Sequence, residues 1–165
     1  MAYDFKKISV LIVENSHAMF DLTQSVLSTF GAGKVLSAFG FQRGFDCFCE
    51  ENPDLVIIDW LEEPLTGLEL TKKIRTDARS PNPYVPIILM SGHSSLKRIL
   101  TARDAGITSF VAKPYTARAL YSRIEHLIEQ PRPFVRSENF TGPDRRVGHA
   151  PIGYNGPDRR NRDEQ

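Results

Sequence analysis

Apolar residues follow two alternating patterns along the first 130 residues of the chain. Short apolar runs rich in β-branched residues predict five strands, at residues 8–13, 35–38, 55–59, 85–90 and 109–112. The segments after each of them carry apolar residues three or four positions apart, which predicts helices at residues 16–30, 41–51, 68–78, 96–105 and 116–129. The chain therefore repeats a strand–helix unit five times.

The predicted strands are apolar along their whole length rather than at every second position. The runs VLIV, LVII and PIILM show this pattern, which is typical of parallel strands covered by helices on both faces. The sequence thus predicts an α/β fold with a doubly wound, five-stranded parallel sheet of flavodoxin-like order 2-1-3-4-5. In such sheets, ligands bind at the carboxyl ends of the strands.

The composition of the chain is that of a soluble globular protein. The chain has 165 residues, of which 41% are hydrophobic and 25% charged, as in ordinary soluble globular proteins. No apolar run is long enough to span a membrane, and the first residues lack the apolar stretch of a secretory signal. Cys47 and Cys49 lie in a predicted helix without the further ligands that a zinc site needs. We therefore expect a cytoplasmic protein.

Polar residues gather where the predicted strands end. Strand 8–13 is followed by Glu14 and Asn15, strand 55–59 ends in Asp59, strand 85–90 is followed by Ser91, and strand 109–112 is followed by Lys113. A single polar residue at a strand end is common. Two carboxylates, a carboxamide, a hydroxyl and an ammonium from four strands at one edge indicate a site.

The motifs VLIVEN, PDLVIIDW, Gly67-Leu68, SGH and AKP together resemble the CheY-like response-regulator receiver family over nearly all of the first 130 residues. The resemblance implies that Asp59 accepts a phosphoryl group from a histidine kinase, and that Ser91 and Lys113 bind the phosphoryl oxygens. It also implies a cis peptide bond before Pro114 and an aromatic switch at Phe110.

Phosphoryl transfer to an aspartate requires cations that neutralise the incoming charge. Magnesium prefers oxygen ligands, and those available are Glu14, Asn15, Asp59 and the backbone carbonyl of Leu61. The family usually has a second acid where this chain has Asn15, so we expect a weaker magnesium site. Glu62 and Glu63 follow Asp59 and either compensate in part or face solvent.

The sequence predicts two parts, a receiver at residues 1–130 and an arginine-rich tail at residues 131–165. The tail holds seven Arg, no Lys and five acids, a net charge of +2. Its five prolines and four glycines predict an extended or disordered segment rather than an output domain. We therefore expect a single-domain regulator that acts by binding a partner, not by enzymatic turnover of a small molecule.

The tail contains a repeat. The heptad from Phe140 to Arg146 (FTGPDRR) recurs 14 residues later from Tyr154 to Arg160 (YNGPDRR). Arginine can bind the O6 and N7 edge of guanine or phosphate oxygens, aspartate can accept from guanine, and aromatic rings can stack on bases. Two such readers in tandem suit cyclic di-GMP, which has two guanines and two phosphates.

A receiver with such a tail resembles the CheY-like cyclic di-GMP effectors (Cle proteins) of alphaproteobacteria, which implies docking to a target such as the flagellar motor switch. The nucleotide ligands that we expect are Arg132, Arg136, Asp144, Arg145, Arg146, Tyr154, Asp158, Arg159 and Arg160. Three alternatives stay open: a receiver controlled by phosphorylation alone, a solubilising tail, and a nucleic-acid-binding arm. The low net charge of the tail disfavours nonspecific binding of nucleic acid, and we expect no DNA partner.

Overall fold

The computed structural model describes residues 4–60 and 66–145. Five strands form one parallel sheet: β1 (Ser9–Val13), β2 (Lys34–Ala38), β3 (Leu55–Asp59), β4 (Ile87–Ser91) and β5 (Ser109–Ala112). The helices that alternate with them are α1 (His17–Thr29), α2 (Phe41–Glu51), α3 (Thr66–Thr76), α4 (Leu96–Ala105) and α5 (Ala117–Glu129). A single turn of 3-10 helix, η1 (Phe5–Lys7), precedes β1. The strand order β2-β1-β3-β4-β5 confirms the predicted topology.

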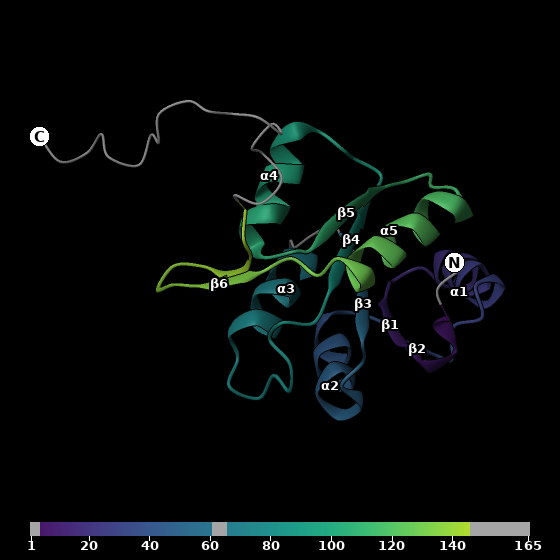
Figure 1. Cartoon of the computed structure of the whole chain (residues 1–165), viewed down its shortest axis with the longest axis horizontal. Coiled ribbons are helices and arrows are strands. Elements are labelled where there is room, and N and C mark those ends of the chain that lie inside the picture. Colours follow the sequence, from purple (N-terminus) through teal and green to yellow (C-terminus); the bar gives the residue numbers. More distant parts are fainter. Residues whose placement is uncertain (1–3, 61–65, 146–165) are drawn as a thin grey trace, which may run out of the picture.

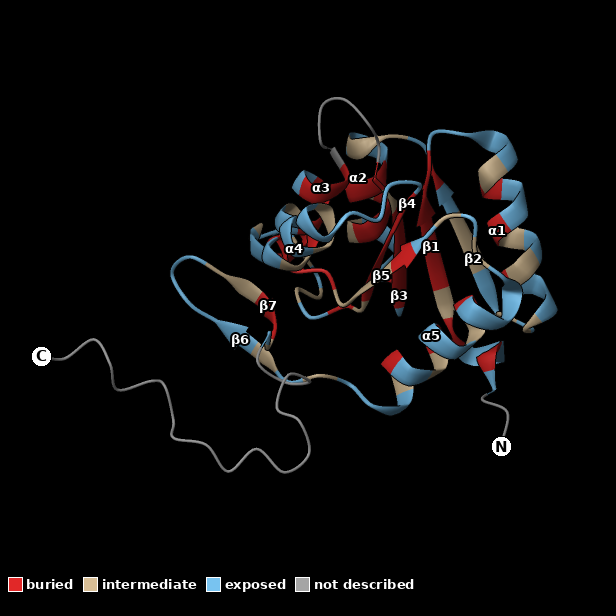
Figure 2. Ribbon diagram, turned by 90° about the horizontal axis from the view of Figure 1, so that it is seen from above, coloured by how far each residue is buried: buried red, intermediate tan, exposed pale blue. Residues whose placement is uncertain are grey.

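The helices cover both faces of the sheet (Figure 1). Alternate strand residues face opposite layers, so Leu11 packs with α2, α3 and α4, whereas its neighbour Ile12 packs with α1 and α5. The side chains of both layers are buried, and this explains why the central strands are apolar at every position (Figure 2). None of the helices in the described ranges has the length and apolar character needed to cross a membrane.

The helix ends follow local chemistry. Ser16, Ser95 and Thr116 cap α1, α4 and α5, each accepting a hydrogen bond from a backbone N–H three residues later. α4 ends at Gly106, whose φ of 103° lies in the left-handed region that glycine adopts readily. The predicted helix boundaries are therefore close to those of the structure.

Strand β4 begins at Ile87, two residues later than predicted. Pro86 has no N–H to donate to a neighbouring strand. The carbonyl of Val85 instead accepts a hydrogen bond of 2.6 Å from Nη1 of Arg75. A side chain from α3 thus takes the place of a strand partner.

The first part of the tail forms an antiparallel hairpin of β6 (Phe134–Arg136) and β7 (Thr141–Pro143). In Figure 1 it projects beside α3 and α4, away from α1. We expected an extended or disordered tail; these residues are extended, but they are paired and packed on the receiver rather than disordered. The Phe134 ring lies over the guanidinium of Arg75, 4.9 Å from its Cζ, and meets the ring of Tyr84 edge-on at 5.3 Å.

Candidate functional site

Four strands deliver the predicted site residues to the same edge of the sheet. Glu14 follows β1, Asp59 ends β3, Ser91 ends β4 and Lys113 follows β5. The bond between Lys113 and Pro114 is cis, as the motif implied. The side chains of Glu14, Asp59 and Lys113 are only 9%, 20% and 19% exposed, so their charges interact away from bulk water.

The ammonium of Lys113 joins the two carboxylates. Its Nζ donates a short hydrogen bond to Oδ1 of Asp59 and lies 3.5 Å from Oε2 of Glu14. Burial favours a lower pKa for Lys113, but the hydrogen bond to Asp59 and the charges of both acids outweigh it and raise the pKa. Lys113 is therefore a fixed positive charge beside Asp59.

Glu14 is held in place by its own chain. Its Oε1 accepts hydrogen bonds from the backbone N–H groups of Asn15, at 3.0 Å, and Ser16, at 3.1 Å. Its other oxygen faces Lys113. The carboxylate of Glu14 thus keeps one oxygen directed toward Lys113. Asn15, the next residue, is exposed.

Ser91 is buried at the end of β4, and its hydroxyl exchanges hydrogen bonds with the backbone of His93. Its Oγ accepts from the His93 N–H at 3.0 Å and lies 3.1 Å from the His93 carbonyl. The loop thereby holds the hydroxyl at the same edge as Asp59.

The donor set fits a magnesium ion. Glu14 and Asp59 supply carboxylate oxygens at one edge, and Asn15 is adjacent; magnesium takes such ligands and keeps several waters. In the part of the chain that the structure describes, no three His, Cys, Asp or Glu side chains are grouped so that they could hold a metal ion. Leu61, Glu62 and Glu63 lie outside the described residues.

Trp60 directly follows Asp59 and pairs with Arg98, a contact that the sequence did not predict. The Arg98 guanidinium from α4 stacks on the Trp60 ring, 4.8 Å from its centre. Trp60 directly follows Asp59 and is buried. Phe110, the expected switch, is half-buried against the layer formed by α2, α3 and α4.

The first repeat of the tail meets α4. Arg145 donates a 2.7 Å hydrogen bond to Oδ1 of Asp104 and stacks on the Phe140 ring, 4.3 Å from its centre. Arg132 donates to the carbonyl of Asp144 at 2.6 Å, so the structure brings these two together. Arg136 lies on β6. The other expected nucleotide ligands, Arg146, Tyr154, Asp158, Arg159 and Arg160, lie outside the described residues.

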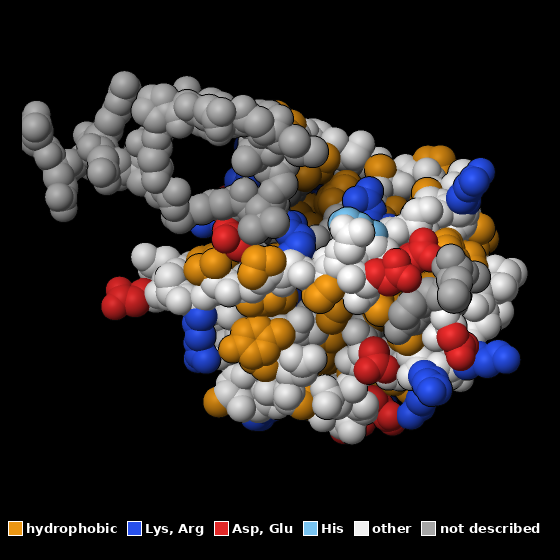
Figure 3. Space-filling model, in the orientation of Figure 1, with side chains coloured by type: hydrophobic (Ala, Val, Ile, Leu, Met, Phe, Trp, Pro, Cys, Tyr) orange, Lys and Arg blue, Asp and Glu red, His pale blue; other side chains and the backbone are white. Residues whose placement is uncertain are grey.

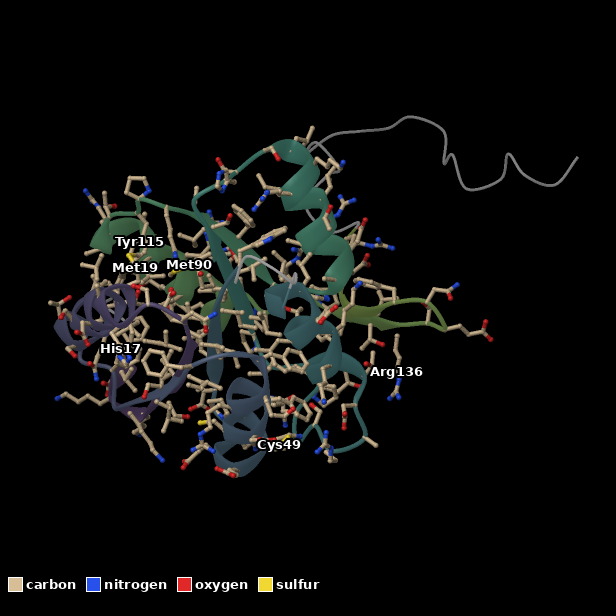
Figure 4. All side chains as sticks on the ribbon, turned by 180° about the vertical axis from the view of Figure 1, so that it is seen from behind. His17, Met19, Cys49, Met90, Tyr115 and Arg136 are labelled. Carbon is tan, nitrogen blue, oxygen red and sulfur yellow. The ribbon has the colours of Figure 1, made fainter. Side chains whose placement is uncertain are left out.

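Arg132, Asp144 and Arg145 are thus gathered at the base of the hairpin. Figure 4 labels Arg136 on the opposite side of the molecule from His17, Met19 and Tyr115. The side chains around Asp59 thus come from the ends of the strands, whereas the described tail residues lie on and beside the hairpin.

Comparison with known proteins agrees with this geometry. Residues 10–125 match the model of the response regulator receiver domain. The chain is 30% identical over 122 residues to chemotaxis protein CheY1 of Helicobacter pylori, covering 72% of this chain and 94% of that protein. It is 25% identical over 123 residues to chemotaxis protein CheY of Pseudomonas aeruginosa, covering 74% and 98%.

A solved structure with the same fold is that of a response regulator from Thermotoga maritima. It is 24% identical, with a TM-score of 0.64, and the match covers 74% of this chain and 98% of that one. The family match, the strand order and the joint placement of Glu14, Asp59, Ser91 and Lys113 all agree: this chain belongs to the response regulator receiver domain family.

Proposed function

We propose that the protein receives a phosphoryl group on Asp59 and transmits the signal by binding another protein. The observation that carries this proposal is the contact of Lys113 with both Asp59 and Glu14, which provides a cation beside the acceptor oxygen. Since similar proteins are named chemotaxis proteins, we propose a histidine kinase as donor and a motor switch protein as one class of target.

In the proposed step, a carboxylate oxygen of Asp59 attacks the phosphorus of a phosphohistidine. The new O–P bond replaces the N–P bond, and the imidazole leaves with a proton from solvent. Lys113 then pairs with the phosphoryl oxygens, and the Ser91 hydroxyl donates to one of them. A magnesium ion on Glu14 and Asp59 would neutralise further charge on the transferred group.

Labelling with acetyl phosphate tests this role. The wild-type protein is expected to gain one phosphoryl group that depends on magnesium, and Asp59→Asn is expected to gain none. Trp60, the one tryptophan of the chain, directly follows Asp59, so its fluorescence offers a second readout. Labelling that persists in Asp59→Asn would reject Asp59 as the acceptor.

We propose, as a second function, that the tail binds cyclic di-GMP. The supporting observation is the grouping in the first repeat of a guanidinium, an aromatic ring and a nearby aspartate, namely Arg145, Phe140 and Asp144. These groups suit a guanine base and its phosphate. The repeat from Tyr154 to Arg160 would supply a second set of the same groups.

Isothermal titration calorimetry with cyclic di-GMP tests the second function. Micromolar or tighter binding is expected for the full chain and is expected to be lost in the Arg145→Ala/Arg159→Ala double variant. A double variant that binds cyclic di-GMP as tightly as the wild type would reject this second function. Binding of RNA or DNA with a steep salt dependence, and without competition by cyclic di-GMP, would instead favour the nucleic-acid alternative.

A further inference from the structure

A groove of about 480 Å³ opens between the hairpin and the helices α3 and α4. Lys72, Arg75 and Thr76 of α3 line one side, and Asp104 and Ala105 of α4 lie beside them. The hairpin completes the groove with Arg136, Ser137, Glu138, Asn139, Phe140 and Thr141. Its walls thus come from both the receiver and the tail.

Two cations of the groove are not paired with an acid in the described residues. Lys72 and Arg136 are exposed, and within residues 4–60 and 66–145 neither takes part in an ion pair. Lys72 comes from α3 and Arg136 from β6, so only the docking of the hairpin places them in one groove. Two cations that are free of ion pairs can both bind an anion such as a phosphate.

Arg75 forms the floor of the groove and cannot act in the same way. Its side chain is buried, and its donors already bind the carbonyls of Gly106, Pro83 and Val85. Burial lowers the pKa of its guanidinium to about 9, which leaves it charged at neutral pH. Arg75 therefore adds positive potential while its hydrogen bonds hold the walls together.

The rim of the groove carries the opposite charge. Glu138 lies at the hairpin turn, and Asp104 pairs with Arg145, whose guanidinium covers the Phe140 ring. Carboxylates repel a bare polyanion, but they accept hydrogen bonds from the N1 and N2 donors of guanine. Cations on the walls and acids on the rim therefore match a guanine nucleotide better than inorganic phosphate or a nucleic-acid backbone. Figure 3 shows charged and hydrophobic side chains next to one another around the hairpin.

We infer that this groove is a composite nucleotide site in which Lys72 of the receiver and Arg136 of the hairpin bind one phosphate of cyclic di-GMP. The acids of the rim accept hydrogen bonds from the attached guanine. This inference rests on the proposed cyclic di-GMP binding and extends it from the tail to helix α3. The volume of the groove lies within the range of about 300 to 1,000 Å³ that is typical of small-molecule sites.

Calorimetry on the full-length protein tests the composite site, with cyclic di-GMP as the probe. Lys72→Gln and Arg136→Gln each remove one charge-assisted contact and are expected to weaken binding about tenfold. Lys97→Gln is the matched control: Lys97 is an exposed lysine of α4 that does not line the groove, and its loss is expected to leave the affinity unchanged.

The outcomes separate the inference from the function on which it rests. If Lys72→Gln and Arg136→Gln bind like the wild type while the Arg145→Ala/Arg159→Ala variant does not bind, the tail alone holds the nucleotide and the composite site is rejected. An equal loss of affinity in Lys97→Gln would show that the loss reflects the net charge of the protein, and it would also reject the composite site. If the wild type does not bind cyclic di-GMP, both proposals fail together.

Discussion

Arg75 links segments that lie far apart in the chain. Its Nε donates to Gly106 at 2.9 Å, and its Nη1 donates to Pro83 at 2.8 Å and to Val85 at 2.6 Å. The ring of Phe134 covers its outer face. A buried cation that satisfies several carbonyls stabilises loops that have few other backbone partners.

Replacing Arg75 by Met is expected to destabilise the protein strongly. The substitution leaves buried carbonyls without donors, at an expected cost of about 2 to 4 kcal/mol in the free energy of unfolding. Urea denaturation followed by circular dichroism measures this. Lys72→Met, an exposed change on the same helix, is the control and is expected to cost less than about 0.5 kcal/mol. A loss below about 1 kcal/mol for Arg75→Met would show that water replaces the lost donors.

The raised pKa of Lys113 predicts a pH dependence. The folded state binds this proton more tightly than the unfolded chain, so the stabilisation is complete below the ordinary lysine pKa of about 10.4. It is lost as pH rises through the higher pKa of the folded state. The difference in unfolding free energy between wild type and Lys113→Met should therefore stay constant from about pH 6 to about pH 10, where Asp59 and Glu14 are ionised, and change as pH rises above it. A change near neutral pH would contradict this assignment.

At the scale of elements, the hairpin rests on α4 through two glycines. A Cβ added to Gly142 would lie 2.9 Å from Cα of Gly106 and 2.8 Å from Cζ of Phe140. The Phe140 ring can move aside, but the backbone at Gly106 cannot. Close packing of β7 on the end of α4 therefore requires Gly142.

Gly142→Ala is expected to release the hairpin without unfolding the receiver. Hydrogen exchange followed by mass spectrometry should show faster exchange at residues 134–143 and unchanged protection in β1 and β3. The control is Gly92→Ala, since no atom outside its chain neighbours lies within 4 Å of a Cβ at that position. Unchanged exchange in the hairpin would mean that Gly142 is not needed for docking.

At the scale of the whole molecule, α3 and α4 run between the edge that carries Asp59 and the groove beside the hairpin. α3 begins after the segment that follows Asp59 and ends beside Arg75, at the groove. α4 begins a few residues after Ser91 and ends at Gly106, against the hairpin. The sheet edge that carries Asp59 and Ser91 and the groove therefore lie at opposite ends of the same two helices.

Deleting residues 131–165 is expected to abolish cyclic di-GMP binding and to leave phosphorylation of Asp59 intact. Glu14, Asp59 and Lys113 pair with one another within the receiver, and a relative such as the P. aeruginosa protein is matched over 98% of its length by 74% of this chain. The rate of labelling by acetyl phosphate should stay within about twofold of the full-length rate. Loss of labelling would show that the acceptor site depends on the tail.

The sequence by itself determined the sheet, its helices and the meeting of Glu14, Asp59 and Lys113 at one edge. Continuous apolar runs specify strands buried on both faces, and parallel strands carry the residues at their ends to one edge, so Asp59 and Lys113 had to meet. Cap residues such as Ser16 and Thr116 specify where helices begin, through hydrogen bonds between residues only three positions apart. These features depend on local patterns and on the topology that follows from them.

Only the tertiary structure decided the roles of Arg75 and the docking of the hairpin. Arg75 has the same side-chain chemistry as a solvated arginine of an amphipathic helix, and its partners lie 8 to 31 residues away. The β-forming Phe134-Val135 and the polar turn after it were a weak hairpin signal, hidden by the prolines and glycines of the tail. Pairing of Arg145 with Asp104, 41 residues away, depends on how the hairpin packs, because no periodic pattern encodes a contact between two exposed charges.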